Sequence, residues 1–95
     1  PTSWTDGDED IFRQELADII DARYVAQVFH NNPVVAGAIN SIRGMISGPG
    51  NSQPDTDSVN MAVDAVIALS KTTDGARLLG DCGINKHGLS YTRQN

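Results

Sequence analysis

Apolar residues recur every three or four positions along much of the 95-residue chain, which is the period of an α-helix. The clearest stretch is 33–46, where Pro33 takes the first helical position after a cap at Asn31 or Asn32. Its apolar stripe consists of Val35, Ala38, Ile39, Ile42, Met45 and Ile46. A Gly-Pro-Gly sequence at 48–50 predicts the end of this helix.

Three further helices are predicted on the same grounds. The first runs from about residue 8 to about residue 21, the second from 55–57 to about Ser70, and a short third from Thr73–Asp74 to Gly80 or Gly83. No segment alternates as a strand would, so the predicted class is all-α: a compact single-domain bundle of about four helices over residues 1–95.

Outside the helices, the sequence predicts a flexible polar loop near 48–55 and a partly mobile C-terminal tail. The tail is expected to add an apolar contact through Ile84, Leu89 or Tyr91. Two glycines inside helix 33–46, Gly37 and Gly44, weaken it, and we expect them to permit the close approach of another helix.

The helix near 8–21 begins in an acidic segment. Asp6 and Glu9 have the spacing of a capping box, which places further carboxylates at the positive end of the helix dipole. Beyond Tyr24 the apolar positions turn toward the side that was acidic. We expect the helix to continue through 21–23 with a local irregularity, although a break there is the alternative.

Net charge is unevenly divided between the two parts of the chain. Residues 1–32 carry seven acids and two bases, a net charge of −5, whereas residues 33–95 carry five of each. An acidic chain is repelled by phosphate backbones, so we expect no direct nucleic acid binding. We expect instead a protein partner with a basic surface.

The acids of the first helix are expected to share one side. On a helical wheel we place Phe12, Leu16, Ile19 and Ile20 within one third of the circumference. The acidic face is expected on the opposite side, and it consists of Asp8, Asp10, Glu15, Asp18 and Asp21. Such a stripe is either a solvated helix face or a surface that imitates nucleic acid phosphates, since carboxylates one turn apart are about 5.4 Å apart along the axis. Trp4 and Tyr24 flank it and are possible aromatic anchors.

A calcium loop is the first alternative for these acids. Asp6, Asp8 and Asp10 match the first, third and fifth positions of an EF-hand loop. The sixth position holds Ile11 instead of glycine, and the twelfth holds Ala17 instead of glutamate. A helix start therefore explains the three acids better, and we expect no metal and no cofactor.

The single Cys82 cannot form an internal disulfide, which fits a reducing compartment. A thiol enzyme would pair Cys82 with His87 or His30, but the spacing does not require this, and a small core residue is the favoured interpretation. No apolar run approaches 20 residues, so a cytoplasmic protein without membrane contact is expected.

No motif identifies a family. We expect a small, acidic, non-enzymatic interaction protein that binds and blocks a macromolecular partner. Phage-type inhibitors of nucleic-acid-handling defence complexes, such as anti-CRISPR and anti-restriction proteins, share its size and charge, as do immunity proteins. The alternatives are a homo-oligomeric scaffold subunit, for example a homodimer, and a small enzyme that depends on Cys82.

Overall fold

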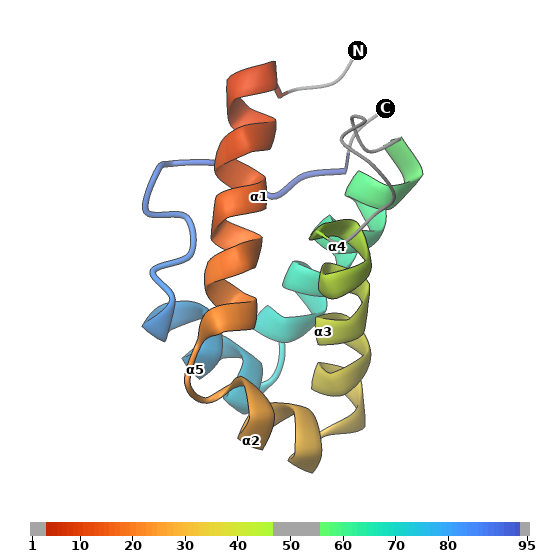
Figure 1. The fold of residues 1–95 in the computed structure, drawn as a ribbon, viewed down its shortest axis with the longest axis vertical. Helices are drawn as coiled ribbons and strands as arrows, with labels where there is room; N and C mark the ends of the chain where they lie inside the picture. Colours follow the sequence, from red (N-terminus) through yellow and green to blue (C-terminus); the bar gives the residue numbers. More distant parts are fainter. Residues whose placement is uncertain (1–3, 47–55, 94–95) are drawn as a thin grey trace.

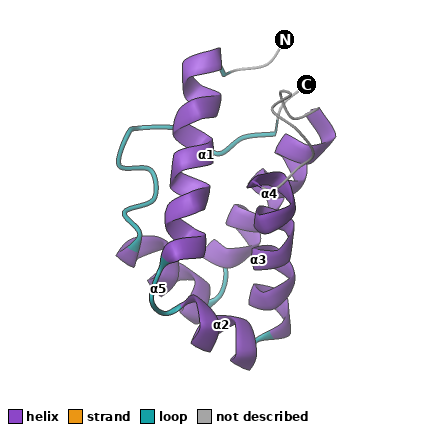
Figure 2. Cartoon of the chain, viewed as in Figure 1, coloured by secondary structure: helices purple, strands orange, loops and turns teal. Residues whose placement is uncertain are grey.

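A computed structural model of the chain describes residues 4–46 and 56–93. They form five helices, α1 (Asp6–Asp21), α2 (Val25–Asn31), α3 (Pro33–Ile46), α4 (Thr56–Ser70) and α5 (Thr73–Asp81). No strand occurs in this part of the chain (Figure 2), so the all-α class is confirmed, with one helix more than predicted. The predicted flexible loop at 48–55 lies outside the described residues. None of the described helices is long and apolar enough to cross a membrane.

Three long helices enclose the core. Antiparallel α3 and α4 pack along their lengths, α1 lies against α3, and α2 and α5 meet at one end of the bundle (Figure 1). The largest fully buried apolar side chains are Phe12, Leu16, Ile19, Val35, Ile39, Ile42, Val59, Val63, Leu69 and Leu78. Burying one such side chain contributes about 1.5–3 kcal/mol, so the predicted apolar stripes account for most of the cohesion.

The first helix breaks where we expected it to continue. α1 ends at Asp21, Ala22 is extended, and Tyr24 is the N-cap residue of the separate helix α2. In a continuous helix the apolar residues after Tyr24 would face outward on the acidic side. The break turns Val25, Val28 and Phe29 back against the core.

The N-cap residues of α1, α3 and α5 lie at or within one residue of the predicted positions. Thr5, not Asp6, caps α1: its hydroxyl accepts from the Asp8 amide at 3.2 Å, and the Asp8 carboxylate accepts from the Thr5 amide at 2.9 Å. Asn32 caps α3 as predicted. Thr72, one residue before the predicted start, caps α5 by accepting from the Gly75 amide at 2.9 Å.

Close packing at a glycine occurs at Gly75 and not at the two glycines for which we expected it. At Gly37 and Gly44 the space that a Cβ would occupy is open to at least 4 Å, so our expectation for these two residues is wrong. At Gly75 a Cβ would lie 2.2 Å from the Leu69 carbonyl oxygen. The first turn of α5 therefore packs directly on the backbone at the end of α4.

The C-terminal segment packs on the bundle. After α5 the chain passes beside α1 and crosses it (Figure 1). Leu89 is buried, and Ile84 and Tyr91 pack against the core, which confirms the predicted apolar contact of the tail. The indole N–H of Trp4 donates to the Ser90 carbonyl at 2.9 Å. This segment thus fastens the start of α1 to the far end of the described chain.

Candidate functional site

Glu15 does not belong to an exposed acidic face. Its side chain is 1% exposed, so the prediction that it faces solvent is wrong. It follows Phe12 by three residues and precedes Ile19 by four, and this helical spacing places it beside them on the buried side. Asp8, four residues before Phe12, stands in the same row and is half-buried.

The buried carboxyl group of Glu15 holds the C-terminal segment. The Tyr91 hydroxyl donates to its Oε2, and the Tyr91 ring meets Phe12 edge-on at 5.7 Å. Its Oε1 has no hydrogen-bond partner among the described residues. Because a polar group buried without partners is costly, this contact matters for the fold, and Glu15 is removed from the candidate binding surface.

The remaining four acids do not form one free stripe either. Asp8 is engaged in the capping box of α1, and Asp18 forms an ion pair of 3.3 Å with Lys86. Asp10 and Asp21 are exposed. Two of the five predicted residues are therefore free surface charges, and the idea that α1 imitates a nucleic acid backbone loses its geometric basis.

The two possible aromatic anchors, Trp4 and Tyr24, differ in what their rings contact. Trp4 is half-buried, and its ring packs on Phe12 with centroids 4.8 Å apart, so it serves the protein's own core. Tyr24 is also half-buried, and the Arg23 guanidinium lies over its ring and donates to its hydroxyl at 2.6 Å.

Cys82 has the environment of a packing residue. Its thiol donates to the Asp18 carbonyl at 3.4 Å, and burial, with a smaller contribution from Asp18, raises the pKa of the thiol above its usual value. His30 and His87 are exposed, and within the described residues neither forms a hydrogen bond with Cys82. Within residues 4–46 and 56–93, no three His, Cys, Asp or Glu side chains gather as metal ligands would.

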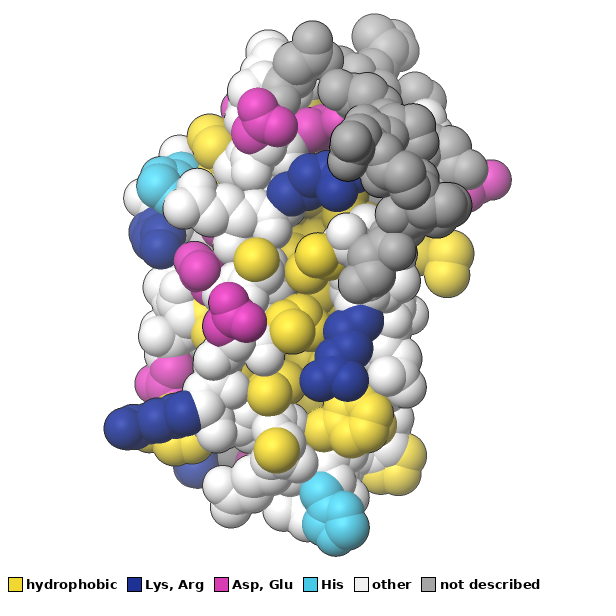
Figure 3. Space-filling view, viewed as in Figure 1, with side chains coloured by type: hydrophobic (Ala, Val, Ile, Leu, Met, Phe, Trp, Pro, Cys, Tyr) yellow, Lys and Arg dark blue, Asp and Glu magenta, His cyan; other side chains and the backbone are white. Residues whose placement is uncertain are grey.

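A groove between α1 and α3 is the feature that the sequence did not reveal. It is lined by Ala17, Ile20, Asp21, Arg43 and Ile46, and its cavity volume is about 120 Å³. Figure 3 shows hydrophobic side chains running down the middle of this face between α1 and α3, with acidic side chains toward α1 and basic ones next to the line. We call it the α1–α3 groove.

One of the two free acids, Asp21, lines this groove, and the other, Asp10, lies on the same side of α1 nearer its start. Asp10, Gln14, Ala17 and Asp21 follow one another at intervals of four, three and four residues, so they form one row on the outside of α1. Asp10 and Asp21 lie about 16 Å apart along the helix axis. On the α3 side, the Arg43 guanidinium lies over the Phe29 ring at 5.4 Å from its centroid. Ile20 and Ile46 were assigned to the core, but both remain partly exposed.

The contact between Tyr91 and Glu15 predicts a loss of stability at alkaline pH. Burial, followed by the hydrogen bond to Glu15, raises the pKa of the Tyr91 phenol well above its usual value of 10. Above about pH 10 the unfolded chain ionises at this residue while the folded chain stays protonated, so stability present below that pH is lost as pH rises. The slope has an upper limit of about 1.4 kcal/mol per pH unit, which partial solvent exposure reduces.

Urea denaturation between about pH 8 and pH 11 measures this slope. Relative to the wild type, Tyr91→Phe should lose less stability over the alkaline part of the range, whereas the matched variant Tyr24→Phe should follow the wild type more closely. Parallel curves for the wild type and Tyr91→Phe would refute the assignment.

The candidate site is thus an apolar surface groove with Asp21 on its α1 side and Arg43 on its α3 side. Its lining residues come from two helices, and more than 20 positions of the chain separate Asp21 on α1 from Arg43 on α3. Comparisons with protein-family models, curated proteins and solved structures find no match to this chain.

Proposed function

We propose that the protein is a non-enzymatic interaction protein that binds another protein at the α1–α3 groove and blocks it. The observation that carries this proposal is the groove itself, in which the partly exposed Ile20 and Ile46 lie beside Asp21, at one end of the row on α1 that also contains Asp10. An apolar centre with a charged margin is the usual composition of a protein–protein interface.

The charge of the chain favours a partner with a basic rim. The net charge of −5 comes entirely from residues 1–32, which include α1 and its acidic row. Opposite charges steer encounter and fix orientation, so basic side chains of the partner would meet Asp10 and Asp21. Arg43 on the other margin would contact an acidic or aromatic group of the partner. This second contact would orient the partner across the groove.

Blocking by occupation of the partner's surface suits this geometry better than imitation of a nucleic acid. An imitation needs an array of free carboxylates, and Glu15, Asp18 and Asp8 are engaged within the protein. A phage-type inhibitor of a defence complex, or an immunity protein, would then act by steric exclusion. A non-enzymatic role is further supported by Cys82, whose raised pKa disfavours the reactive thiolate.

Two variants of the groove test the proposal. Ala17→Arg places a long charged side chain in the groove, and the double variant Asp10→Lys with Asp21→Lys reverses the acidic row. Each should weaken binding of the partner recovered with the wild-type protein by about tenfold or more, which corresponds to a loss of about 1.4 kcal/mol. Pull-down followed by a titration with the recovered protein measures the loss.

The matched control is the double variant Asp57→Lys with Asp81→Lys, because both residues are exposed, lie on other helices and give the same change in net charge. It should retain the partner. Circular dichroism establishes that all variants are folded. Equal recovery of the partner by all variants, or loss with the control pair as well, would rule out the α1–α3 groove as the binding surface.

A further inference from the structure

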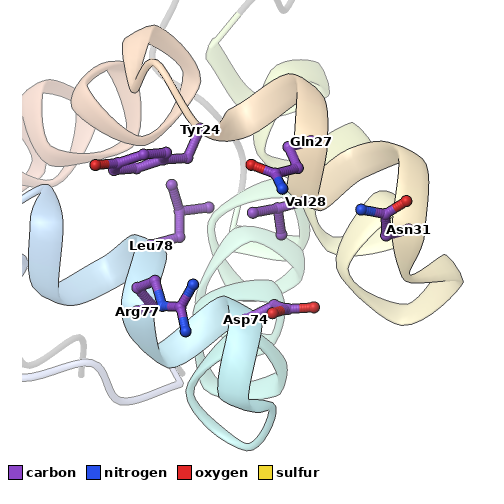
Figure 4. A pocket seen from close by; sticks show the side chains of 7 residues that line it. All are labelled: Tyr24, Gln27, Val28, Asn31, Asp74, Arg77 and Leu78. Atoms are coloured by element: carbon purple, nitrogen blue, oxygen red, sulfur yellow. The ribbon is translucent and has the colours of Figure 1, made fainter.

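A second cavity lies between α2 and α5, at the end of the bundle away from the start of α1 (Figures 1 and 4). Val28 and Leu78 form its apolar floor, and the ring of Tyr24 closes one side. Its cavity volume is about 60 Å³, which admits a molecule of a few heavy atoms. It shares no residue with the α1–α3 groove.

Four polar side chains surround this cavity. Gln27 and Asn31 stand one turn apart on α2, and Asp74 and Arg77 stand one turn apart on α5 (Figure 4). None of the four side chains forms a hydrogen bond or ion pair with any residue that the structure describes.

Some charged side chains elsewhere on the surface do form ion pairs. Lys86 pairs with Asp18, and Arg93 pairs with Asp64. Asp74 and Arg77 have opposite charges and a spacing that allows an ion pair on a helix, yet they form no ion pair with each other. Two opposite charges and two amides are therefore all available to a molecule in the cavity.

The helix that carries the amides is weakly held. α2 has seven residues, and none of them is fully buried. A ligand that contacts Gln27 and Asn31 on one side and Asp74 and Arg77 on the other would connect α2 to α5. Binding would therefore stabilise this end of the bundle.

We propose that this cavity binds a small zwitterion of the α-amino-acid type. The planar guanidinium of Arg77 suits a carboxylate, and the carboxylate of Asp74 suits an ammonium group. The amides of Gln27 and Asn31 both donate and accept, so they can bond to either end of the ligand. Val28 and Leu78 accommodate a short aliphatic side chain. The proposal is independent of the α1–α3 groove and of the function proposed for it.

The test is an NMR titration of the ¹⁵N-labelled protein with glycine and L-alanine, with acetate and methylamine as probes of each charge alone. We expect saturable shifts confined to amides of α2 and α5 with the two amino acids. Acetate and methylamine should bind at least tenfold more weakly. Arg77→Gln and Asp74→Asn should each weaken amino-acid binding by tenfold or more, whereas the control variants Lys71→Gln and Asp57→Asn, at exposed positions outside the cavity, should not.

Several outcomes would overturn the proposal. Shifts that grow linearly without saturation, or that are equal in Arg77→Gln and the wild type, would show general solvent effects of the amino acid. Saturable binding of acetate or methylamine as tight as that of alanine would show a site for one ion. Should Asp74→Asn fail to fold because it alters the first turn of α5, the result with Arg77→Gln decides, since Arg77 is exposed and forms no hydrogen bond or ion pair with a described residue.

Discussion

Tyr91→Phe should lower the free energy of unfolding by about 3 kcal/mol, although it removes one oxygen atom. The reason is that the Tyr91 hydroxyl is the hydrogen-bond donor to the carboxyl group of Glu15, which is 1% exposed and whose other oxygen has no partner among the described residues. Without this donor the carboxyl group remains buried but has no hydrogen bond to offset the free energy cost of its desolvation. For a domain of this size, the melting temperature should fall by about 10–20 °C.

A double variant distinguishes the lost hydrogen bond from lost packing. Glu15→Met combined with Tyr91→Phe replaces both partners by apolar groups of similar size, and it should recover most of the stability. Glu15→Met alone should cost less than Tyr91→Phe alone, because it leaves only a half-buried hydroxyl without a partner. If the double variant is as unstable as the sum of the single variants, the contact does not have the role assigned to it.

Gly75→Ala should have the second large effect, a loss of about 3 kcal/mol in the free energy of unfolding. The added Cβ would lie 2.2 Å from the Leu69 carbonyl oxygen and 2.6 Å from the Thr72 hydroxyl. A side chain can rotate away, but the backbone of α4 cannot, so α5 must shift as a whole. That shift would disturb the cap at Thr72 and the buried Leu78. Urea denaturation with tryptophan fluorescence measures the loss.

Gly80→Ala is the matched control for this prediction. Gly80 lies on the same helix, is exposed, and has nothing within 4 Å of the position of the added Cβ. Alanine favours a helix by about 1 kcal/mol over glycine, so this variant should be slightly more stable than the wild type. A loss of stability in Gly80→Ala comparable with that in Gly75→Ala would indicate that α5 tolerates no substitution. The backbone clash at Gly75 would then not be the cause of the loss in Gly75→Ala.

The helices were predictable because their signals are local. Pro33 and the stripe that follows it define α3, and the caps of α1, α3 and α5 were placed within one residue. The break at Ala22 was only the alternative to the favoured continuous helix, since it depends on how Val25 and Phe29 reach the core once α3 is in place. The sequence shows that these residues change sides, but it does not decide between a break and a distorted helix.

The candidate site was less predictable for a related reason. We placed all the acidic residues of α1 on the exposed side because they are charged. Glu15, however, lies three residues after Phe12 and four before Ile19, and this spacing indicates burial. Its partner, Tyr91, is 76 residues away, and no local pattern identifies that pair. The α1–α3 groove likewise exists only where two helices meet, so no single segment of the sequence contains its signal.

The contacts of the C-terminal segment have a consequence for the order in which the chain assembles. α3 and α4 are neighbours in sequence and form the most extensive pair, so they are able to associate early. Trp4 meets Ser90, and Glu15 meets Tyr91, across separations of 86 and 76 residues, so these loops close at a high entropic cost. On the ribosome, α1 is therefore synthesised well before the segment that covers it, and Glu15 remains hydrated until Tyr91 emerges.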